Sequence, residues 1–506
     1  MLVENQAHVP DILDCIANLS SDEVFTPPDV ANQVLDQFPV EIWSDPNIKI
    51  LDPCCKTGIF LRECAKRLMV GLAKSIPDEV ARRNHIFQNM LYGIAITELT
   101  GLMARRSLYY TKDASNEHSV FQFDDPQGNI TYKRFEHDYI QGRCSICGSP
   151  YENLERGESM ENYAYQFIHE QEVSKMKFDV VIGNPPYQIS DGGGGKGSSA
   201  SPIYHLFVNQ AFRLKPRYVS MIIPSRWFAG GKGLDSFREQ MLNSTNFTNL
   251  NDYPAAADLF PSVEIKGGVC YFLWDSKYDG PCKVTTTVSG QEPTISNRYL
   301  GEHGDTFIRY AEALPILEKV KAKSKEYLDS QVYSRKPFGL TSNFADHKDK
   351  PFADSVTLYR LGGISYVKRN QILANHDSID KWKVLIGKGY NGGDSFPHQI
   401  MAEPIVAAPG SACTETYLIL GLFDSEKEAK NFSTFVRTRL FRFLVALRKN
   451  TQNMSKSVFA FVPIFSLKAQ LSDEVLYSHY GITKDEVKFI ESIVREMPNS
   501  SSGNNK

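Results

Sequence analysis

The feature that most restricts the fold of this chain is a short apolar run that ends in two consecutive prolines. Residues 178–187 read Phe-Asp-Val-Val-Ile-Gly-Asn-Pro-Pro-Tyr. β-Branched side chains bounded by Gly and Pro predict a buried strand that stops at Asn184. In open α/β sheets, ligands bind in the crevice outside the carboxyl ends of the strands. We therefore expect residues 184–187 to form a functional tetrapeptide at that edge of a sheet.

The chemistry of this tetrapeptide suits an amino group on a planar ring. Pro185 and Pro186 remove two backbone donors and fix φ, so the Asn184 side-chain oxygen and nearby carbonyls can be held as acceptors. Two acceptors on the N–H bonds of an exocyclic amine would make its nitrogen more nucleophilic, while Tyr187 offers a flat face to the ring. The alternative interpretation is a Pro-Pro turn that only ends an ordinary strand.

A second strand-to-loop transition lies upstream. Residues 48–61 predict a strand ending at Asp52, a tight loop that contains Pro53 and Gly58, and then a helix. This arrangement is typical of the first turn of a doubly wound, nucleoside-binding fold. The Asp52 carboxylate could hold a cofactor's ammonium group or a bridging water, and Gly58 permits a close approach of the backbone. Further upstream, residues 25–29 read Phe-Thr-Pro-Pro-Asp and predict the start of a helix.

These three segments occur in the order found in the γ-class N6-adenine DNA methyltransferases of restriction-modification systems, and the chain resembles that family. The resemblance implies a Rossmann-like catalytic sheet, S-adenosylmethionine as the cofactor, and methyl transfer to the N6 atom of an adenine flipped out of double-stranded DNA. It implies four catalytic residues: Asn184, Pro185, Pro186 and Tyr187. The cofactor-binding residues that it implies are Phe25, Thr26, Pro27, Asp52, Pro53, Gly58, Glu98 and Asp124.

Some positions depart from the family pattern. Lys56 stands where the family has a glycine, and lysine would be a poor occupant if the position required a positive φ. Ala95 holds the usual place of the acid that binds the ribose, which leaves Glu98 as the nearest carboxylate, although Glu98 could simply lie in the first turn of a helix. Asp124 or Asp125 could contact the cofactor's adenine, and a plain loop is the alternative.

Other functional classes stay open at this stage. An N4-cytosine DNA methyltransferase and a protein or ribosomal RNA methyltransferase would use a similar tetrapeptide. A non-catalytic DNA-binding subunit would explain Lys56 and Ala95 as signs of a decayed cofactor pocket. We expect double-stranded DNA as the main partner, with a restriction endonuclease or helicase subunit as a further candidate.

The sequence predicts an α/β catalytic domain followed by an α+β target-recognition domain. The expected boundaries are 1–305 for the catalytic domain with an insert at about 111–175, 306–332 for a solvated connector helix, 333–496 for the DNA-binding domain and 497–506 for a disordered tail. Candidate DNA contacts are Lys196 in a glycine-rich stretch, Arg226, and three residues of a helix predicted over 427–449, namely Arg437, Arg439 and Arg442.

Cysteine usage and charge narrow the class further. Cys144 and Cys147 form a lone CxxC, with His137 and His169 near enough in sequence to complete a zinc site, but an isolated CxxC is more often metal-free and we expect no metal. The remaining cysteines of a total of nine are spread thinly, which indicates a reducing compartment. A net charge of -3 means that any DNA contact must come from local basic patches. The chain has no signal-like start and no long apolar run, so we expect a cytoplasmic protein without membrane contact.

Overall fold

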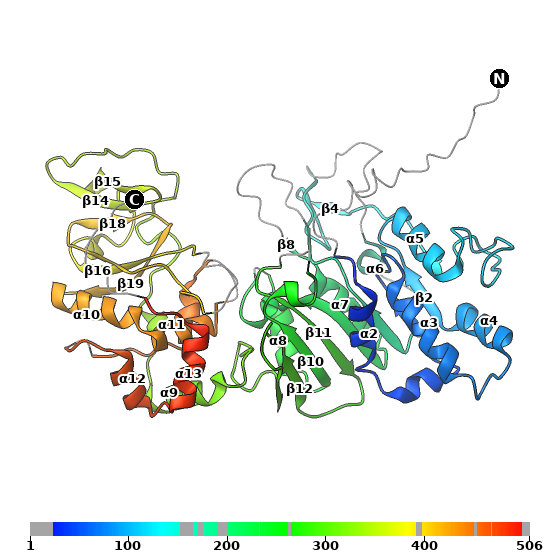
Figure 1. Cartoon of the computed structure of the whole chain (residues 1–506). Coiled ribbons are helices and arrows are strands. Elements are labelled where there is room, and N and C mark those ends of the chain that lie inside the picture. The colour runs from blue at the N-terminus through cyan, green and yellow to red at the C-terminus, as the bar shows by residue number, and fades with distance from the viewer. Residues whose placement is uncertain are drawn as a thin grey trace, which may run out of the picture. The chain divides into compact units, whose positions relative to one another are not determined.

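The computed structural model describes residues 24–151, 165–170, 176–189, 201–231, 233–261, 265–390, 397–449, 453–466 and 468–497 (Figure 1). The chain divides into two compact units. The first contains the residues up to 227 together with 231–307, and the second contains 228–230 and the residues from 308 onward. Lys196, with the glycine-rich stretch around it, and the tail after 497 lie outside the described residues.

The first unit is organised on one sheet, which has nine strands in the described part of the chain, in the order β13-β12-β10-β11-β9-β6-β1-β2-β3. Strands β9, β6, β1, β2 and β3 run parallel, whereas β11 is antiparallel to its neighbours β9 and β10. The strand bounds are β1 Ile50–Asp52, β2 Leu91–Ile94, β3 Ile130–Thr131, β6 Val180–Gly183, β9 Tyr218–Pro224, β10 Phe247–Tyr253, β11 Val269–Asp275, β12 Cys282–Thr286 and β13 Thr294–Arg298. The mixed α/β sheet expected from the sequence is confirmed.

Both faces of the parallel strands are covered, which explains why their sequences are continuous apolar runs rather than alternating ones. In β9, Tyr218 and Ile222 belong to the core shared with the helices α2 to α5, whereas Val219, Met221 and Ile223 are buried on the other side, where α7 contacts β9. The helices of this unit are α2 Pro28–Leu35, α3 Ile59–Gly71, α4 Glu79–Asn89, α5 Glu98–Tyr109, α6 Gln166–His169, α7 Tyr204–Arg213 and α8 Asp235–Asn243.

The expected insert is shorter than the range 111–175. Residues 130–131 form β3, which pairs with β2 at the edge of the main sheet, so the chain is still part of the sheet there. Beyond β3 come a short hairpin, β4 Tyr139–Ile140 with β5 Arg143–Cys144, and then α6. A second small hairpin, β7 Gln188–Ile189 with β8 Ser201–Pro202, follows β6.

The second unit combines small sheets with helices, as the prediction of an α+β domain requires. One sheet has the order β15-β14-β18 and the other β17-β16-β19. Their bounds are β14 Ser355–Arg360, β15 Gly363–Lys368, β16 Trp382–Gly387, β17 Ile405–Ala407, β18 Ser411–Cys413 and β19 Tyr417–Phe423. The helices are α9 Ala313–Lys323, α10 Glu426–Arg437, α11 Arg439–Ala446, α12 Asp473–Tyr480 and α13 Lys484–Ile493.

Two helix predictions in this region are wrong. The solvated connector over 306–332 is instead the shorter helix α9, and its residues Ile316, Leu317 and Val320 are fully buried in the core of the second unit. The helix expected over 427–449 is two helices, because Thr438 adopts an extended backbone and caps α11 by accepting a hydrogen bond from the Phe441 amide. In both cases the alternation of charged and apolar residues was compatible with a longer helix than packing and capping allow.

Candidate active site

The carboxyl ends of β1 and β6 form the centre of the candidate site. These strands are parallel neighbours, with Ile50 opposite Val180, so Asp52 and Asn184 emerge at the same edge of the sheet. The chain runs from β1 outward through β2 and β3 on one side, and from β6 to β9 on the other. The strand order therefore reverses between β1 and β6, and such a switch point is where open α/β sheets bind ligands.

A close approach between the two strand ends depends on Gly183. A Cβ atom placed there would lie 2.9 Å from both Asp52 Oδ1 and Cys54 Sγ, which is too close for any side chain. Glycine thus allows β6 to lie against the loop after β1. This contact brings the predicted catalytic tetrapeptide next to the predicted cofactor loop.

The segment before α2 fixes the orientation of the Asn184 amide. Asn184 Nδ2 donates hydrogen bonds to the Val24 carbonyl at 3.2 Å and to Thr26 Oγ1 at 3.1 Å. A carbonyl can only accept, so the group facing Val24 must be the NH2 of the amide. Asn184 is buried and its Oδ1 accepts no hydrogen bond within the part of the chain that the structure describes. The amide therefore holds one unused acceptor in a fixed direction.

Lys56 supports this arrangement instead of disturbing it. Its Nζ is buried and donates to the same Val24 carbonyl at 3.0 Å. Lys56 does not have a positive φ, so the concern that lysine would strain this loop is unfounded. The left-handed position is Gly58, with φ of 70°, immediately before α3. Sequence reasoning treated Lys56 as a defect, although a buried lysine in a loop signals a nearby carbonyl acceptor.

Asp52 is a buried carboxyl group with a high proton affinity. Only 2% of the residue is exposed, and burial raises its pKa from 3.8 to about 7 despite the hydrogen bond that Oδ1 accepts from the Cys54 amide at 3.1 Å. The charge of Lys56 opposes the rise in this pKa only weakly. A carboxyl group in this state gains most from a cationic ligand, since a positive charge at its side would restore ionisation.

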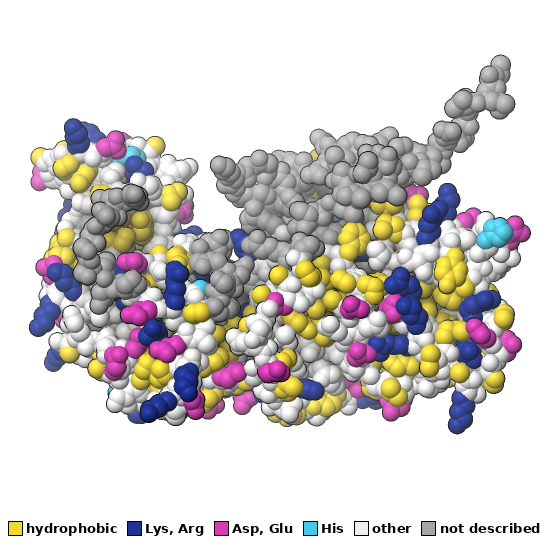
Figure 2. Space-filling view, in the orientation of Figure 1, with side chains coloured by type: hydrophobic (Ala, Val, Ile, Leu, Met, Phe, Trp, Pro, Cys, Tyr) yellow, Lys and Arg dark blue, Asp and Glu magenta, His cyan; other side chains and the backbone are white. Residues whose placement is uncertain are grey.

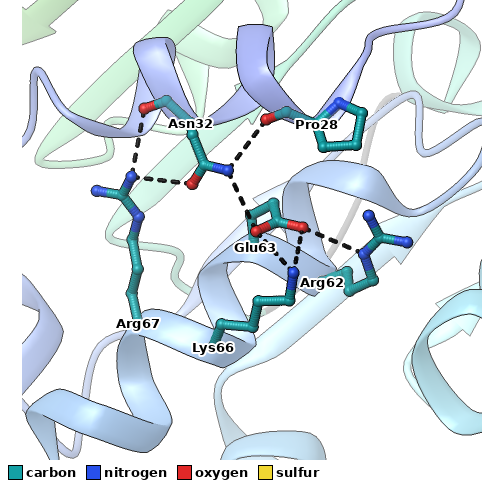
Figure 3. Close-up of polar contacts among 6 residues, drawn as sticks. All are labelled: Pro28, Asn32, Arg62, Glu63, Lys66 and Arg67. Atoms are coloured by element: carbon teal, nitrogen blue, oxygen red, sulfur yellow. Dashed lines mark hydrogen bonds and ion pairs between the residues drawn. The ribbon is translucent and has the colours of Figure 1, made fainter.

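A polar cluster joins α2 to α3 (Figure 3), and α2 begins directly after the segment that contains Val24 and Thr26. Asn32 on α2 donates from Nδ2 to Glu63 Oε2 on α3 at 3.3 Å, and Arg67 Nη2 on α3 donates back to Asn32 Oδ1 at 3.0 Å. Lys66 Nζ lies 2.8 Å from Glu63 Oε1. Because α3 begins at Ile59, directly after the Asp52 loop, these bonds link the helix that follows the Val24–Thr26 segment to the helix that follows that loop.

Tyr187 is more enclosed than the sequence predicted. Only 7% of it is exposed, it belongs to the core of the first unit, and burial raises the pKa of its hydroxyl well above 10. The interpretation that its face receives a flipped ring stays a prediction. The same applies to Phe25, Thr26 and Pro27 as cofactor contacts, although the structure brings this segment against Asn184.

The two acidic cofactor candidates lie at opposite edges of the sheet. Glu98 is the exposed first residue of α5, just beyond the carboxyl end of β2, so it shares an edge with Asp52 and can serve either expected role. Asp124 is exposed in the loop that leads into the amino end of β3. That loop is tied to the amino end of β2, because Asn129 Nδ2 donates to the carbonyls of Phe87 and Gln88. Asp124 is therefore on the wrong edge for the cofactor, and this prediction is wrong.

The residue at the carboxyl end of β3 is Tyr132, which sequence reasoning did not select. It is half-buried, and a Cβ on Gly101 would lie 3.3 Å from the Ala95 Cβ and 3.7 Å from the Tyr132 Cβ. Ala95 and Tyr132 thus flank the same point of α5, on the edge that holds Asp52. Tyr132 could be identified as a site residue only once β3 was known to pair with β2 at the edge of the sheet.

The predicted DNA contacts in the second unit are engaged in structural bonds. Arg442 is fully buried and donates to the carbonyls of Arg437, Thr438, Gln399 and Arg495. Its guanidinium thereby satisfies the carbonyls where α10 ends, and burial lowers its pKa to about 10. The prediction that Arg442 binds DNA is wrong, because its side chain cannot reach a phosphate.

The other basic candidates differ among themselves. Arg437 forms an ion pair with Glu403 at 3.1 Å, and Arg439 forms pairs with Glu491 and Glu496 at 3.3 and 3.5 Å. On the face shown in Figure 2, the blue side chains are interspersed with magenta ones and do not gather in one patch. Arg226 is half-buried directly after β9, at the same edge of the sheet as Asn184. DNA contact by Arg226, Arg437 and Arg439 stays a prediction.

A second constellation lies in the hairpin after β3. The side chains of His137, Cys144, Cys147 and His169 converge, with their ligand atoms all within 4.8 Å of one another. From the sequence we expected no metal, because a second CxxC or a histidine pair at the usual spacing is missing and a lone CxxC is more often metal-free. In the folded chain, each of the two cysteines lies beside one of the two histidines.

Comparison with known proteins identifies a family. Residues 89–260 match the family model described as Eco57I restriction-modification methylase. A protein of Mycoplasma pneumoniae described as an uncharacterized adenine-specific methylase is 38% identical over 318 residues, which cover 57% of this chain and 75% of that protein. This chain belongs to the adenine-specific methylase family. The part of this adenine-specific methylase matched by the family model includes residues 184–187.

Solved structures resemble the chain more distantly. A nuclease-deletion mutant of the Type ISP restriction-modification enzyme LlaGI has a TM-score of 0.46 at 11% identity, covering 86% of this chain and 46% of that chain. The Type IIL restriction-modification enzyme MmeI has a TM-score of 0.43 at 10% identity, covering 88% and 65%. The methylase chain spans about half the length of other solved structures that it matches, including a modification subunit from Vibrio vulnificus. Among the described residues, no helix has the length and hydropathy needed to cross a membrane.

Proposed function

We propose that this chain transfers a methyl group from S-adenosylmethionine to the N6 atom of adenine in double-stranded DNA. The observation that supports this most directly is the Asn184 side chain, whose NH2 group is tied to Val24 and Thr26 while its Oδ1 stays free. An acceptor held in this way, at the switch point of the sheet and beside a buried carboxyl group, suits a reaction at an amino group.

The residues at the sheet edge fit the proposed cofactor. Asp52 is a buried carboxyl group with a raised pKa, and a cationic ligand is what would stabilise its ionised form. Gly58 and the loop after Asp52 would place backbone close to the ligand, and Glu98 and Tyr132 would line the far side of the same edge. When bound there, S-adenosylmethionine supplies an electrophilic methyl group on a sulfonium. The chain's own role is to bind it and to orient the amine.

Asn184 and Pro185 would act on the target amine as acceptors. Asn184 Oδ1 and the Pro185 carbonyl would each accept one N6 hydrogen, which raises electron density on the nitrogen and holds its lone pair toward the methyl group. The chain needs no strong base, since the nitrogen becomes acidic only as the new C–N bond forms and its proton can then pass to water. Most of the rate enhancement would come from positioning, and a misplacement of Asn184 would therefore be costly.

The target adenine must leave the duplex to reach Asn184, which is 4% exposed. We infer that Tyr187 contacts the extruded base once its ring face is uncovered, and that the second unit, with its small sheets and exposed basic residues, contributes to DNA binding. A restriction endonuclease or helicase subunit would be a further partner, and co-purification from the native cell would identify it.

The test uses adenine-unmethylated genomic DNA and the purified full chain. We expect N6-methyladenine to appear in a defined sequence context, as seen by mass spectrometry of nucleosides and by single-molecule sequencing. Asn184→Ala should lose methylation but bind S-adenosylmethionine in calorimetry with unchanged affinity. Full activity of that variant would remove Asn184 from the reaction. If the product is N4-methylcytosine, the target base is cytosine and not adenine. If the unaltered chain does not bind S-adenosylmethionine, the proposal that it is a methyltransferase is wrong.

A further inference from the structure

The four converging side chains after β3 have the chemistry of a zinc site. Two thiols and two imidazoles are preferred ligands of Zn²⁺. Cys144 Sγ lies 3.5 Å from His169 Nε2, and Cys147 Sγ lies 3.3 Å from His137 Nδ1. In a tetrahedral site with the usual bond lengths, sulfur and nitrogen ligands are about 3.5 Å apart. The observed separations therefore match a shared central ion.

The backbone around the two cysteines forms a tight turn that brings their sulfur atoms together. They lie at the end of the β4–β5 hairpin, where Gly148 has a φ of 72° and its amide donates to the Cys144 carbonyl at 2.9 Å. The Cys144 amide also donates to the Ser149 carbonyl at 2.8 Å, which closes the turn after the first cysteine. The glycine permits the tight turn that points both sulfur atoms to one side.

The second histidine is oriented by a bond from its other nitrogen. His169 Nδ1 lies 2.9 Å from the Tyr165 carbonyl, which can only accept, so Nδ1 carries the proton and Nε2 presents its lone pair to the cluster. The helix α6 that carries His169 is itself anchored, because Phe167 stacks on Phe207 of α7 with ring centroids 5.9 Å apart. His169 is therefore a fixed ligand on the body of the first unit.

The hairpin packs little apolar surface against the main core in the part of the chain that the structure describes. Among the described residues between 133 and 170, none belongs to the core formed by the sheet and the helices α2 to α5. Small segments that cannot bury a sufficient apolar core are commonly fixed by disulfides or by a metal. Cys144 and Cys147 are both free thiols in the structure, so a disulfide does not fill this role.

We propose that His137, Cys144, Cys147 and His169 bind a single Zn²⁺ ion that fastens the β4–β5 hairpin to α6. Each cysteine lies beside one histidine, so the ligands surround one centre, and a two-iron cluster with its cysteines on one iron and its histidines on the other does not fit. The ion completes its coordination with protein ligands alone, which makes it a structural site and not a catalytic one. It links the chain that leaves β3 to the helix that precedes β6 and Asn184.

The experiment measures metal in the purified full chain and does not depend on methyl transfer. We expect one zinc ion per chain by mass spectrometry of metals after growth in zinc-supplemented medium and passage over a chelating resin. Cobalt(II) added to the metal-stripped chain should give the absorption bands of a tetrahedral thiolate site. Removal of zinc should lower the melting temperature and expose sites between 132 and 151 to protease.

Single variants distinguish the proposed metal ligands from a cysteine that does not bind the metal. Cys147→Ser should lose zinc and the cobalt bands, whereas Cys282→Ala, a buried thiol on β12 far from the hairpin in sequence, should retain both. A His169→Gln variant provides a second ligand loss if Cys147→Ser folds poorly. The proposal is overturned if the unaltered chain carries no zinc, if it carries iron in its place, or if Cys147→Ser holds as much zinc as Cys282→Ala.

Discussion

Thr26→Val tests whether the segment before α2 orients the reacting side chain. Valine has the shape of threonine but lacks the hydroxyl that accepts the hydrogen bond from Asn184 Nδ2 at 3.1 Å. Thr26 does not cap α2 through its side chain, since Pro27 is at the N-cap position and makes no side-chain bond there. The substitution should therefore leave the helix intact and act on the amide of Asn184.

The size of the effect follows from the contacts of that amide. With Thr26 Oγ1 removed, one N–H of Asn184 loses its partner in a buried setting, and only the Val24 carbonyl remains. A buried donor without a partner costs about 1–3 kcal/mol, and rotation of the amide to avoid this cost would turn Oδ1 away from the target amine. Converted to a rate, this corresponds to a fall in the rate constant for methyl transfer of about 5- to 150-fold.

The assay is single-turnover transfer of a tritiated methyl group to unmethylated genomic DNA, with cofactor affinity measured separately by calorimetry. We expect the single-turnover rate constant to fall while the Kd for S-adenosylmethionine stays within about twofold. A large rise in that Kd would instead mark Thr26 as the direct cofactor contact expected from the sequence. Thr26→Ser keeps the hydroxyl and should restore most of the rate. A valine variant as fast as the unaltered chain, or a serine variant as slow as valine, would refute the orienting role.

Three further predictions concern single side chains. Burial raises the pKa of Asp52 to about 7, so the folded chain ionises this group only above that pH, and at a cost in stability. Asp52→Asn should therefore raise the unfolding free energy at pH 8 by up to about 4 kcal/mol, with the gain vanishing toward pH 4. The same variant should weaken cofactor binding, and the cofactor affinity of the unaltered chain should fall below pH 7, both in titrations by calorimetry. Arg442→Met should lower the unfolding free energy by about 3 kcal/mol in denaturant titrations, because buried carbonyls lose their donor. Arg437→Ala should lower it far less, and equal losses would contradict the structural role of Arg442. Tyr187→Ala should weaken binding of a DNA with an abasic site opposite the target adenine by about 1–3 kcal/mol more than Tyr187→Phe, and identical affinities would exclude stacking.

The site illustrates how a buried lysine can be a structural part of a predicted cofactor loop. Lys56 and Asn184 donate to one carbonyl, that of Val24, which lies 32 residues before the first and 160 before the second. The loop after Asp52 and the predicted catalytic tetrapeptide are thus joined through a third segment. A departure from the family pattern at Lys56 is therefore not by itself a sign of a lost pocket.

The sequence alone determined the local features of this protein. The strands ending at Asp52 and Asn184, the helix start after Pro27 and the order of the three segments could all be predicted, because they depend on neighbouring residues: β-branched runs, prolines and glycines restrict the backbone wherever they occur. The family resemblance rests on the same short segments. The mixed α/β sheet followed from their alternation with helices.

Only the tertiary structure decided which distant residues meet and which side of an element is covered. It placed Asp124 at the amino edge of the sheet, buried Arg442 against helix-terminal carbonyls and brought His169 to Cys144. These outcomes depend on strand order and helix packing, which bring distant segments of the chain together. Such contacts produce no repeating pattern in the sequence. The sequence does not show whether a charged or ligating side chain faces solvent, a carbonyl or another ligand. Only the fold distinguishes these cases.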